Sequence, residues 1–115
     1  MKPNKVLSIL GISAKAGYIA SGEFQTERAI KTSMAYLVIV ADDASENTKK
    51  MFCNMCDFYK VPQIIYGTKD EIGHAIGKEY RSSLAVTDKG LAKSVFDNYE
   101  MLNNLNHGGQ ENDKN

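Results

Sequence analysis

The stretch that decides the fold is Tyr36–Ala41, which reads YLVIVA. An uninterrupted run of apolar, largely β-branched residues is typical of a strand that is buried on both faces. A strand of this kind lies at the centre of a sheet that carries helices on either side. We therefore expect an α/β protein that is built outward from residues 36–41.

Helical and strand-like segments alternate on both sides of this run. The predicted helices are 5–12, 23–34, 46–59, 68–77 and 89–102, and the other predicted strands begin near Tyr18 or cover 63–66 and 83–86. The predicted helix caps are Asn4, Ser45 or Asp43, Thr68 with Glu71, and Thr87. This alternation predicts a three-layer α/β/α sandwich with a small central mixed sheet of about four strands.

The chain of 115 residues is long enough for one hydrophobic core. We expect a single domain over residues 1–105. Residues 106–115 (NHGGQENDKN) contain no apolar anchor, so we expect a disordered tail there. The chain has no apolar run near the roughly 20 residues that span a bilayer, and its start is poorly shaped for a secretory signal. These features predict a cytoplasmic protein with no membrane partner.

The charges balance over the chain but not within it. Lys+Arg and Asp+Glu both number 14, so the formal net charge is zero and the chain is not in the strongly basic class of nucleic-acid-binding proteins. Residues 1–36, however, hold five basic and two acidic side chains. This predicts a local positive surface near the N-terminal end, unless the charges are ordinary solvated scatter.

Patterns that would indicate catalysis or a metal are weak. Cys53 and Cys56 form a lone C-x-x-C in mid-helix without a second ligand pair, which favours reduced cysteines packed against the core over a zinc site. His74 is isolated on a helix, so no nucleophile–base pair can be assembled. The interpretation is a protein with no catalytic activity, no metal, no cofactor and no small-molecule substrate.

A weaker hypothesis is a small enzyme or a phosphate-ligand binder. It depends on Asp42-Asp43, which follow the predicted central strand, and on the glycine-containing segment Gly11–Gly17. Paired aspartates also suit a helix start, where carboxylates accept free N–H groups. The segment 11–17 lacks the Gly-Lys-Ser/Thr ending of a P-loop and follows a helix rather than a strand.

The most informative stretch for function is Ser21–Ala29, SGEFQTERA. Gly22 opens a predicted helix whose first-turn N–H groups can meet a phosphate or a base edge. Gln25 offers an amide that both donates and accepts, and Arg28 lies one turn further on the same side. An ordinary capped helix with solvated charges remains the alternative for these residues.

Nine short motifs together resemble the kink-turn-binding ribosomal protein family, which includes large-subunit proteins seven-Ae and thirty-e. The resemblance covers roughly residues 5–97 and is closest to a bacterial branch of small ribosomal-protein-like proteins. The motifs are Leu10–Gly17, Ser21–Glu23, Leu37–Ser45, Asn47–Lys50, Val61–Pro62, Gly67–Thr68, Ile72–Gly73, Ile76–Lys78 and Ala85–Asp88.

The resemblance implies an α/β/α fold and a non-catalytic protein that binds structured RNA, ribosomal or otherwise containing a kink-turn. It also implies an RNA site made of the start of the second helix and the loop before the last strand, in a mode where RNA is read at bulges and unpaired bases. With two basic side chains of the N-terminal third added, the predicted RNA-binding residues are Lys15, Gly22, Glu23, Phe24, Gln25, Arg28, Lys31, Gly77, Lys78, Glu79, Tyr80 and Arg81.

Glu23 and Phe24 differ from the small hydroxyl residue and the Asn or Lys that the family's kink-turn binders usually carry at these positions. They support an alternative hypothesis: a protein-interaction module on the same fold that has lost specific kink-turn binding.

Overall fold

The predicted central strand is strand β2, Leu37–Val40, and all four of its residues are buried in the computed structural model. The structure describes residues 4–114, with side chains described through residue 105. β2 pairs in parallel with β3 (Gln63–Ile65) and antiparallel with β4 (Ser83–Val86), and β4 pairs antiparallel with β1 (Ile19–Ser21). The sheet order is β1-β4-β2-β3, which confirms the predicted small mixed sheet.

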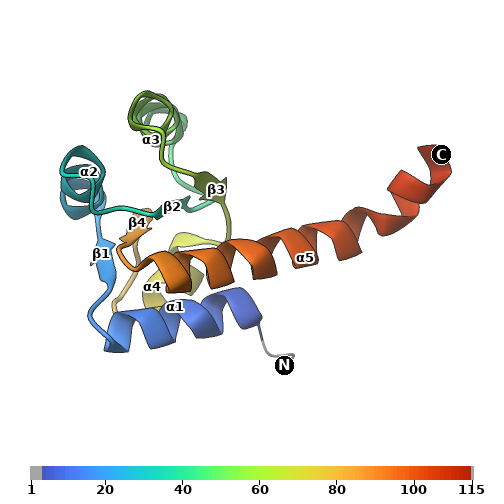
Figure 1. Cartoon of the computed structure of the whole chain (residues 1–115), viewed down its shortest axis with the longest axis horizontal. Coiled ribbons are helices and arrows are strands. Elements are labelled where there is room, and N and C mark those ends of the chain that lie inside the picture. The colour runs from blue at the N-terminus through green and yellow to red at the C-terminus, as the bar shows by residue number, and fades with distance from the viewer. Residues whose placement is uncertain (1–3, 115) are drawn as a thin grey trace.

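Helices cover both faces of the sheet (Figure 1). Helices α2 (Glu23–Lys31) and α3 (Glu46–Tyr59) lie on one face. Helices α1 (Lys5–Lys15), α4 (Lys69–Ala75) and α5 (Lys89–Lys114) lie on the other. This arrangement is the three-layer α/β/α sandwich that the sequence predicted.

The core is continuous from one helical layer through the sheet to the other. Fully buried side chains come from α1, α2, α3, α4, α5 and both central strands, and they include Val6, Leu10, Ile30, Leu37, Val38, Ile39, Val40, Phe52, Ile72, Leu84, Val86 and Val95. Both faces of β2 and β4 are therefore buried. This agrees with their sequences, in which apolar residues do not alternate with polar ones.

Two helix ends differ from the predicted ones, and for α1 the reason is tertiary packing. α1 continues to Lys15 instead of ending at Ile12. Gly11 does not end it: a Cβ there would lie 3.0 Å from the Ala75 carbonyl oxygen, so the glycine allows α1 to approach α4. α2 ends at Lys31 rather than Met34, and Ser33 beyond it has a positive φ of 62°.

Two aspartates accept N–H groups at helix starts in ways that differ from those predicted from the sequence. The Asp88 carboxylate, rather than Thr87, accepts the N–H of Leu91 at 2.9 Å in the first turn of α5. Ser45 caps α3, whereas Asp43 reaches across to accept the N–H of Lys69 at 2.9 Å. The predicted capping box of Thr68 and Glu71 is present.

The last helix is longer than predicted. α5 continues past Leu102, since neither proline nor glycine stands between that residue and Leu105 to end it. The side chains of residues 106–115 lie outside those that the structure describes, so the expected disorder of this tail stays a prediction. Of the described helices, none is both long enough and apolar enough to cross a membrane.

Candidate functional site

The start of α2 is an open helix terminus. Gly22 has φ 94° and ψ 159°, a backbone conformation that L side chains rarely adopt, and its N–H donates to the Ser83 carbonyl at 3.0 Å. Gly22 has no side chain with which to cap the helix. The N–H groups of the first turn, from Glu23 through Gln25, therefore have no capping acceptor and are available to a ligand.

A buried pair of hydroxyl groups holds this helix start against the sheet. Thr26 and Ser83 are both fully buried. The Ser83 hydroxyl donates to the Thr26 hydroxyl oxygen at 3.2 Å, and the Thr26 hydroxyl donates to the Ala20 carbonyl at 3.5 Å. These contacts join α2 to β4 and β1, so the open terminus has a rigid base.

The loop between α4 and β4, residues 77–81, is held by main-chain hydrogen bonds. Lys78 N–H donates to the Gly73 carbonyl at 2.8 Å, and Arg81 N–H donates to the Lys69 carbonyl at 3.1 Å. A Cβ on Gly73 would lie 2.3 Å from the Tyr80 Cα, so only glycine lets α4 and the loop come this close. Gly77 itself has a positive φ of 79°.

Arg81 joins the two predicted pieces. Its Nε donates to the Ser21 hydroxyl at 3.3 Å, and its Nη1 donates to the Tyr80 carbonyl at 2.8 Å. Since Ser21 immediately precedes Gly22, this side chain brings the loop beside the start of α2. Before the fold was known, only the family resemblance implied that these two segments are neighbours.

Two aromatic side chains project from this surface. Phe24 is 70% exposed and Tyr80 is 59% exposed. Lys69 Nζ lies 6.0 Å from the centroid of the Tyr80 ring, at the outer limit of a cation–π contact. Lys69 was not among the predicted site residues, because its only sequence signal is its place in the first turn of a capped helix.

The remaining predicted residues divide into two groups. Glu23, Gln25, Arg28, Lys78 and Glu79 are exposed near the two segments. Lys15, in the last turn of α1, lines a hollow of about 320 Å³ together with Gly77, so it lies beside the loop.

Lys31 lies apart from this group. It is at the opposite end of α2, about 12 Å along the helix axis from Glu23. Its ammonium is 2.9 Å from the Glu27 carboxylate, and that hydrogen bond raises the pKa of Lys31.

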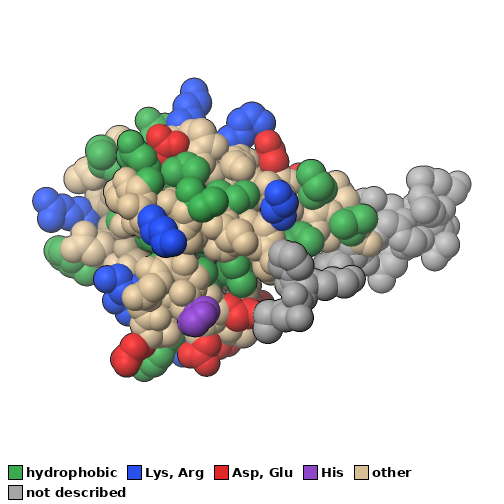
Figure 2. Space-filling view, turned by 90° about the horizontal axis from the view of Figure 1, so that it is seen from below, with side chains coloured by type: hydrophobic (Ala, Val, Ile, Leu, Met, Phe, Trp, Pro, Cys, Tyr) green, Lys and Arg blue, Asp and Glu red, His purple; other side chains and the backbone are tan. Residues whose placement is uncertain are grey.

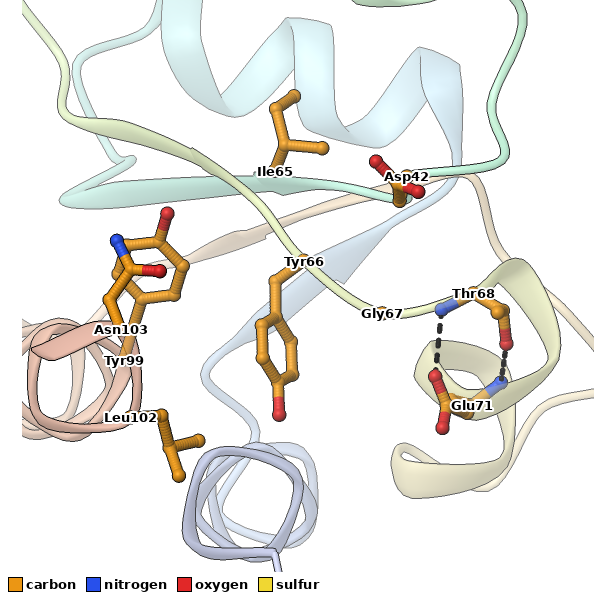
Figure 3. Close-up of a pocket in the computed structure, with 9 residues that line it drawn as sticks. All are labelled: Asp42, Ile65, Tyr66, Gly67, Thr68, Glu71, Tyr99, Leu102 and Asn103. Carbon is orange, nitrogen blue, oxygen red and sulfur yellow. Dashed lines mark hydrogen bonds between the residues drawn. The ribbon is translucent and has the colours of Figure 1, made fainter. Parts of the chain in front are cut away.

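A pocket at the carboxyl ends of β2 and β3 tests the hypothesis of a phosphate ligand (Figure 3). It has a volume of about 350 Å³ and is lined by Asp42 and Glu71 together with the rings of Tyr66 and Tyr99. The Glu71 carboxylate accepts the N–H of Thr68 at 2.9 Å within the capping box. Two carboxylates in the lining disfavour an anionic ligand because like charges repel. The segment from Gly11 through Lys15 is helical, so it forms no phosphate loop.

The two cysteines differ in environment. Cys56 packs into the core as predicted, with 2% of its surface exposed, and burial raises the pKa of its thiol to about 11. Cys53 is exposed, so the prediction that both pack against the core is wrong for this residue. Over the side chains that are described, no cluster of three or more His, Cys, Asp or Glu could hold a metal ion.

The face formed by α1, α4 and α5 carries side chains of mixed character. Figure 2 shows basic, acidic and hydrophobic side chains interspersed over it rather than one basic patch. A nucleic-acid-binding surface is usually a region of one sign. This face therefore shows no single basic patch that would indicate a nucleic-acid site.

Comparison with known proteins gives one consistent family. The model of the ribosomal protein L7Ae/L30e/S12e/Gadd45 family matches residues 4–96. The chain is 38% identical over 88 residues to the RNA-binding protein YlxQ of Bacillus subtilis (strain 168), covering 76% of this chain and 88% of that protein. It is 37% identical over 91 residues to the RNA-binding protein YlxQ of Enterococcus faecium, covering 79% and 87%.

Solved structures agree in fold. A protein of unknown function from Bacillus halodurans is 33% identical, with a TM-score of 0.83 over 85% of this chain and 99% of that one. The 15.5kD RNA binding protein of Giardia lamblia is 20% identical, with a TM-score of 0.72 over 88% and 87%, a likeness of fold. The chain therefore belongs to the ribosomal protein L7Ae/L30e/S12e/Gadd45 family, as its short motifs had indicated.

Proposed function

We propose that this protein binds structured RNA without catalysing a reaction, through the surface formed by the start of α2 and residues 77–81. The observation that carries the proposal is the hydrogen bond from Arg81 to Ser21, which sets the loop beside an uncapped helix terminus. The names of the similar YlxQ proteins support RNA as the ligand.

The surface offers groups that can bind the phosphate, the base edge and the base face of an unpaired nucleotide. Open N–H groups at the positive end of α2 suit a phosphate or a base edge. Gln25 can read a base edge, and Arg28, Lys15 and Lys78 can neutralise phosphates. The exposed rings of Phe24 and Tyr80 can stack on splayed bases.

We infer that the RNA is a kink-turn or a related non-helical element, of ribosomal or other origin, met in the cytoplasm. A regular A-form helix has a deep, narrow major groove that side chains cannot read, whereas a bend or bulge widens the groove and exposes bases. The surface combines a helix terminus, which needs a wide groove, with two exposed aromatic rings, which need unstacked bases.

An electrophoretic mobility-shift titration tests the function. A kink-turn RNA and a regular duplex of the same length and composition would be titrated at two salt concentrations. We expect tighter binding to the kink-turn and an affinity that falls with salt, because phosphate contacts release counterions. Equal, weak binding to both RNAs, or no binding to either, would refute the proposal.

A second candidate function is a protein-interaction module, and Glu23 and Phe24 favour it. A carboxylate at the first position of α2 opposes phosphate, and Phe24 is exposed without a donor for a base. The Phe24→Lys variant separates the two functions. If the protein binds RNA, the new ammonium should tighten kink-turn binding, because it adds a donor and a phosphate partner. An unchanged, negligible RNA affinity in both proteins would favour the protein-interaction module.

A further inference from the structure

A second hollow lies at the end of the strands opposite the Arg81 surface. It has a volume of about 340 Å³, within the range of roughly 300–1,000 Å³ that ligand pockets occupy. Its apolar lining comes from the amino ends of β2 and β3 and from the first turns of α5: Tyr36, Leu37, Pro62, Ala92 and Phe96.

The strand register separates this hollow from the Arg81 surface. Leu37 pairs with Val86 at the end of β2 that faces the hollow, and Val40 pairs with Ser83 at the other end, where Ser83 receives the N–H of Gly22. The two ends of β2 are about 10 Å apart. A ligand in the hollow and a ligand on the Arg81 surface therefore have room to bind at the same time.

Lysines border the hollow. Lys89 and Lys93 both line it, one turn apart on α5. Lys93 pairs with Asp97 at 2.7 Å, whereas Lys89 takes part in no ion pair with another described side chain. Asp88, the nearest acidic neighbour in sequence, is engaged by the Leu91 N–H. Asp88 makes no ion pair with Lys89, so the Lys89 ammonium is available to a carboxylate of a ligand.

From this combination we propose that the hollow, which we name the Tyr36 pocket, binds an acidic polypeptide segment of another protein. One large apolar side chain of the segment enters the pocket, and flanking carboxylates meet Lys89 and Lys93. Tyr36 is 47% exposed, so the peptide segment would also contact the Tyr36 ring at the mouth of the pocket. Apolar centres with a polar, charged rim are the usual anatomy of such interfaces.

Two other occupants fit the Tyr36 pocket less well. A second copy of this chain, docked by the same surface, would bring the lysines of both protomers together, because a two-fold interface uses the same patch twice. Residues 106–115 of this chain carry Glu111 and Asp113 but no apolar side chain that could enter the pocket.

The test uses NMR titration of the full chain with three synthetic peptides. The first has one central leucine flanked by glutamates, the second replaces the leucine with alanine, and the third replaces the glutamates with lysines. We expect the first peptide to shift the amide signals of Leu37, Ala92 and Phe96, with the other two at least about fivefold weaker. No shift with the leucine peptide at about 1 mM, or equal shifts with the lysine peptide, would overturn the proposal.

Matched variants separate the charge and the apolar contact from folding. Lys89→Glu should weaken binding of the leucine peptide about fivefold. The same change leaves the fold intact, because an acidic residue is favoured in the first turn of a helix. Lys50→Glu, on the opposite helical layer, is the control and should leave the peptide affinity unchanged. An equal loss in both variants would mean a non-specific charge effect and would refute the site.

Two variants, each measured for peptide binding and for RNA binding, distinguish a failure of this proposal from a failure of the RNA proposal. Tyr36→Ser should weaken the leucine peptide and leave RNA binding unchanged, whereas Tyr80→Ser should do the opposite. Sedimentation of the unliganded protein completes the test. A monomer is expected, and a dimer that Tyr36→Ser dissociates would assign the pocket to a second copy and overturn the proposal.

Discussion

At the scale of single residues, the candidate RNA surface depends on which hydrogen-bond donors are not already used within the protein. Gly22 leaves a helix terminus uncapped, and Arg81 commits its Nε and Nη1 to protein oxygens. Arg28 is exposed and takes part in no ion pair with the described side chains. Arg81 therefore has a positioning role, and Arg28 is the guanidinium that is available to a phosphate.

Replacing Arg28 or Gln25 with alanine should have different effects on RNA binding. Arg28→Ala should weaken binding to all RNAs and lower the slope of log affinity against log salt by about one phosphate contact. Gln25→Ala should reduce discrimination between RNA sequences by about 1–3 kcal/mol for the base it reads. Affinities for matched RNA variants at several salt concentrations provide the measurement. RNA binding that is robust and indifferent to both changes would show that another surface is used.

The buried thiol of Cys56 should make stability depend on alkaline pH. Burial raises its pKa from 9.0 to about 11, so between these values the unfolded chain has lost a proton that the native chain keeps. Cys56 then contributes stability below pH 9.0, and this contribution declines as the pH rises toward about 11. Urea unfolding from about pH 8 to pH 11 should show a smaller decline for Cys56→Ala than for the parent protein. Cys53→Ser is the comparison, and most of the parent's pH dependence should persist in it, because Cys53 is the smaller of the two causes that raise the pKa of Cys56.

At the scale of elements, the close approach of α4 to the loop sets the shape of the site. Gly73 is buried, and the space where its Cβ would stand is occupied by main-chain atoms of Glu79 and Tyr80. Main-chain atoms of a short, hydrogen-bonded loop have little freedom to move aside. The position of Tyr80 and Arg81 beside α2 therefore depends on a residue that lies outside the binding surface.

Gly73→Ala should destabilise the protein and weaken RNA binding together. Overpacking against main-chain atoms costs about 1–3 kcal/mol and displaces residues 77–81. Gly90→Ala is the matched control, because its Cβ would meet only the Asp88 carboxylate at 3.4 Å. An alanine there should stabilise α5 by up to about 1 kcal/mol and leave RNA binding unchanged. Denaturant unfolding and RNA titration of both variants test this, and an unaltered RNA affinity in Gly73→Ala would contradict the role given to the loop.

At the scale of the whole molecule, the two ends of the strands carry different chemistry. The open terminus of α2 and the Arg81 contact lie at the end of β2 where Val40 pairs with Ser83. The apolar Tyr36 pocket with its lysines lies at the other end, where Leu37 pairs with Val86. On the two proposals together, the protein would hold an RNA and a partner protein at the same time.

The last residues should contribute little to stability or to RNA binding. Leu105 is 76% exposed, and the residues that follow it contain no apolar side chain. A chain that ends at Leu105 should melt within about 2 °C of the full chain and bind RNA equally well. Differential scanning calorimetry and RNA titration provide the comparison. A fall of several degrees, or weaker binding, would give the tail a structural or functional role.

The sequence predicted the fold well because local and global signals agree in it. The apolar run Tyr36–Ala41 contains the buried strand β2, Leu37–Val40, although Tyr36 itself is exposed, and the capping pattern of Thr68 and Glu71 begins α4. The sequence predicted the helix ends less well, because tertiary packing can override the local tendency of a residue such as glycine to end a helix. Gly11 suggests a helix end, but it is a packing position inside α1 because the Ala75 carbonyl lies against it.

The sequence by itself determined the layers, the buried strand, the family and the open start of α2, because each depends on short-range patterns of apolar and capping residues. Tertiary structure alone decided which distant segments meet. Arg81 reaches Ser21 across 60 positions of chain, and Tyr36 and Phe96 come to line one pocket. Their chain separation gives no local signal, since such contacts arise only when the register of β4 between β1 and β2 brings the ends of these elements together.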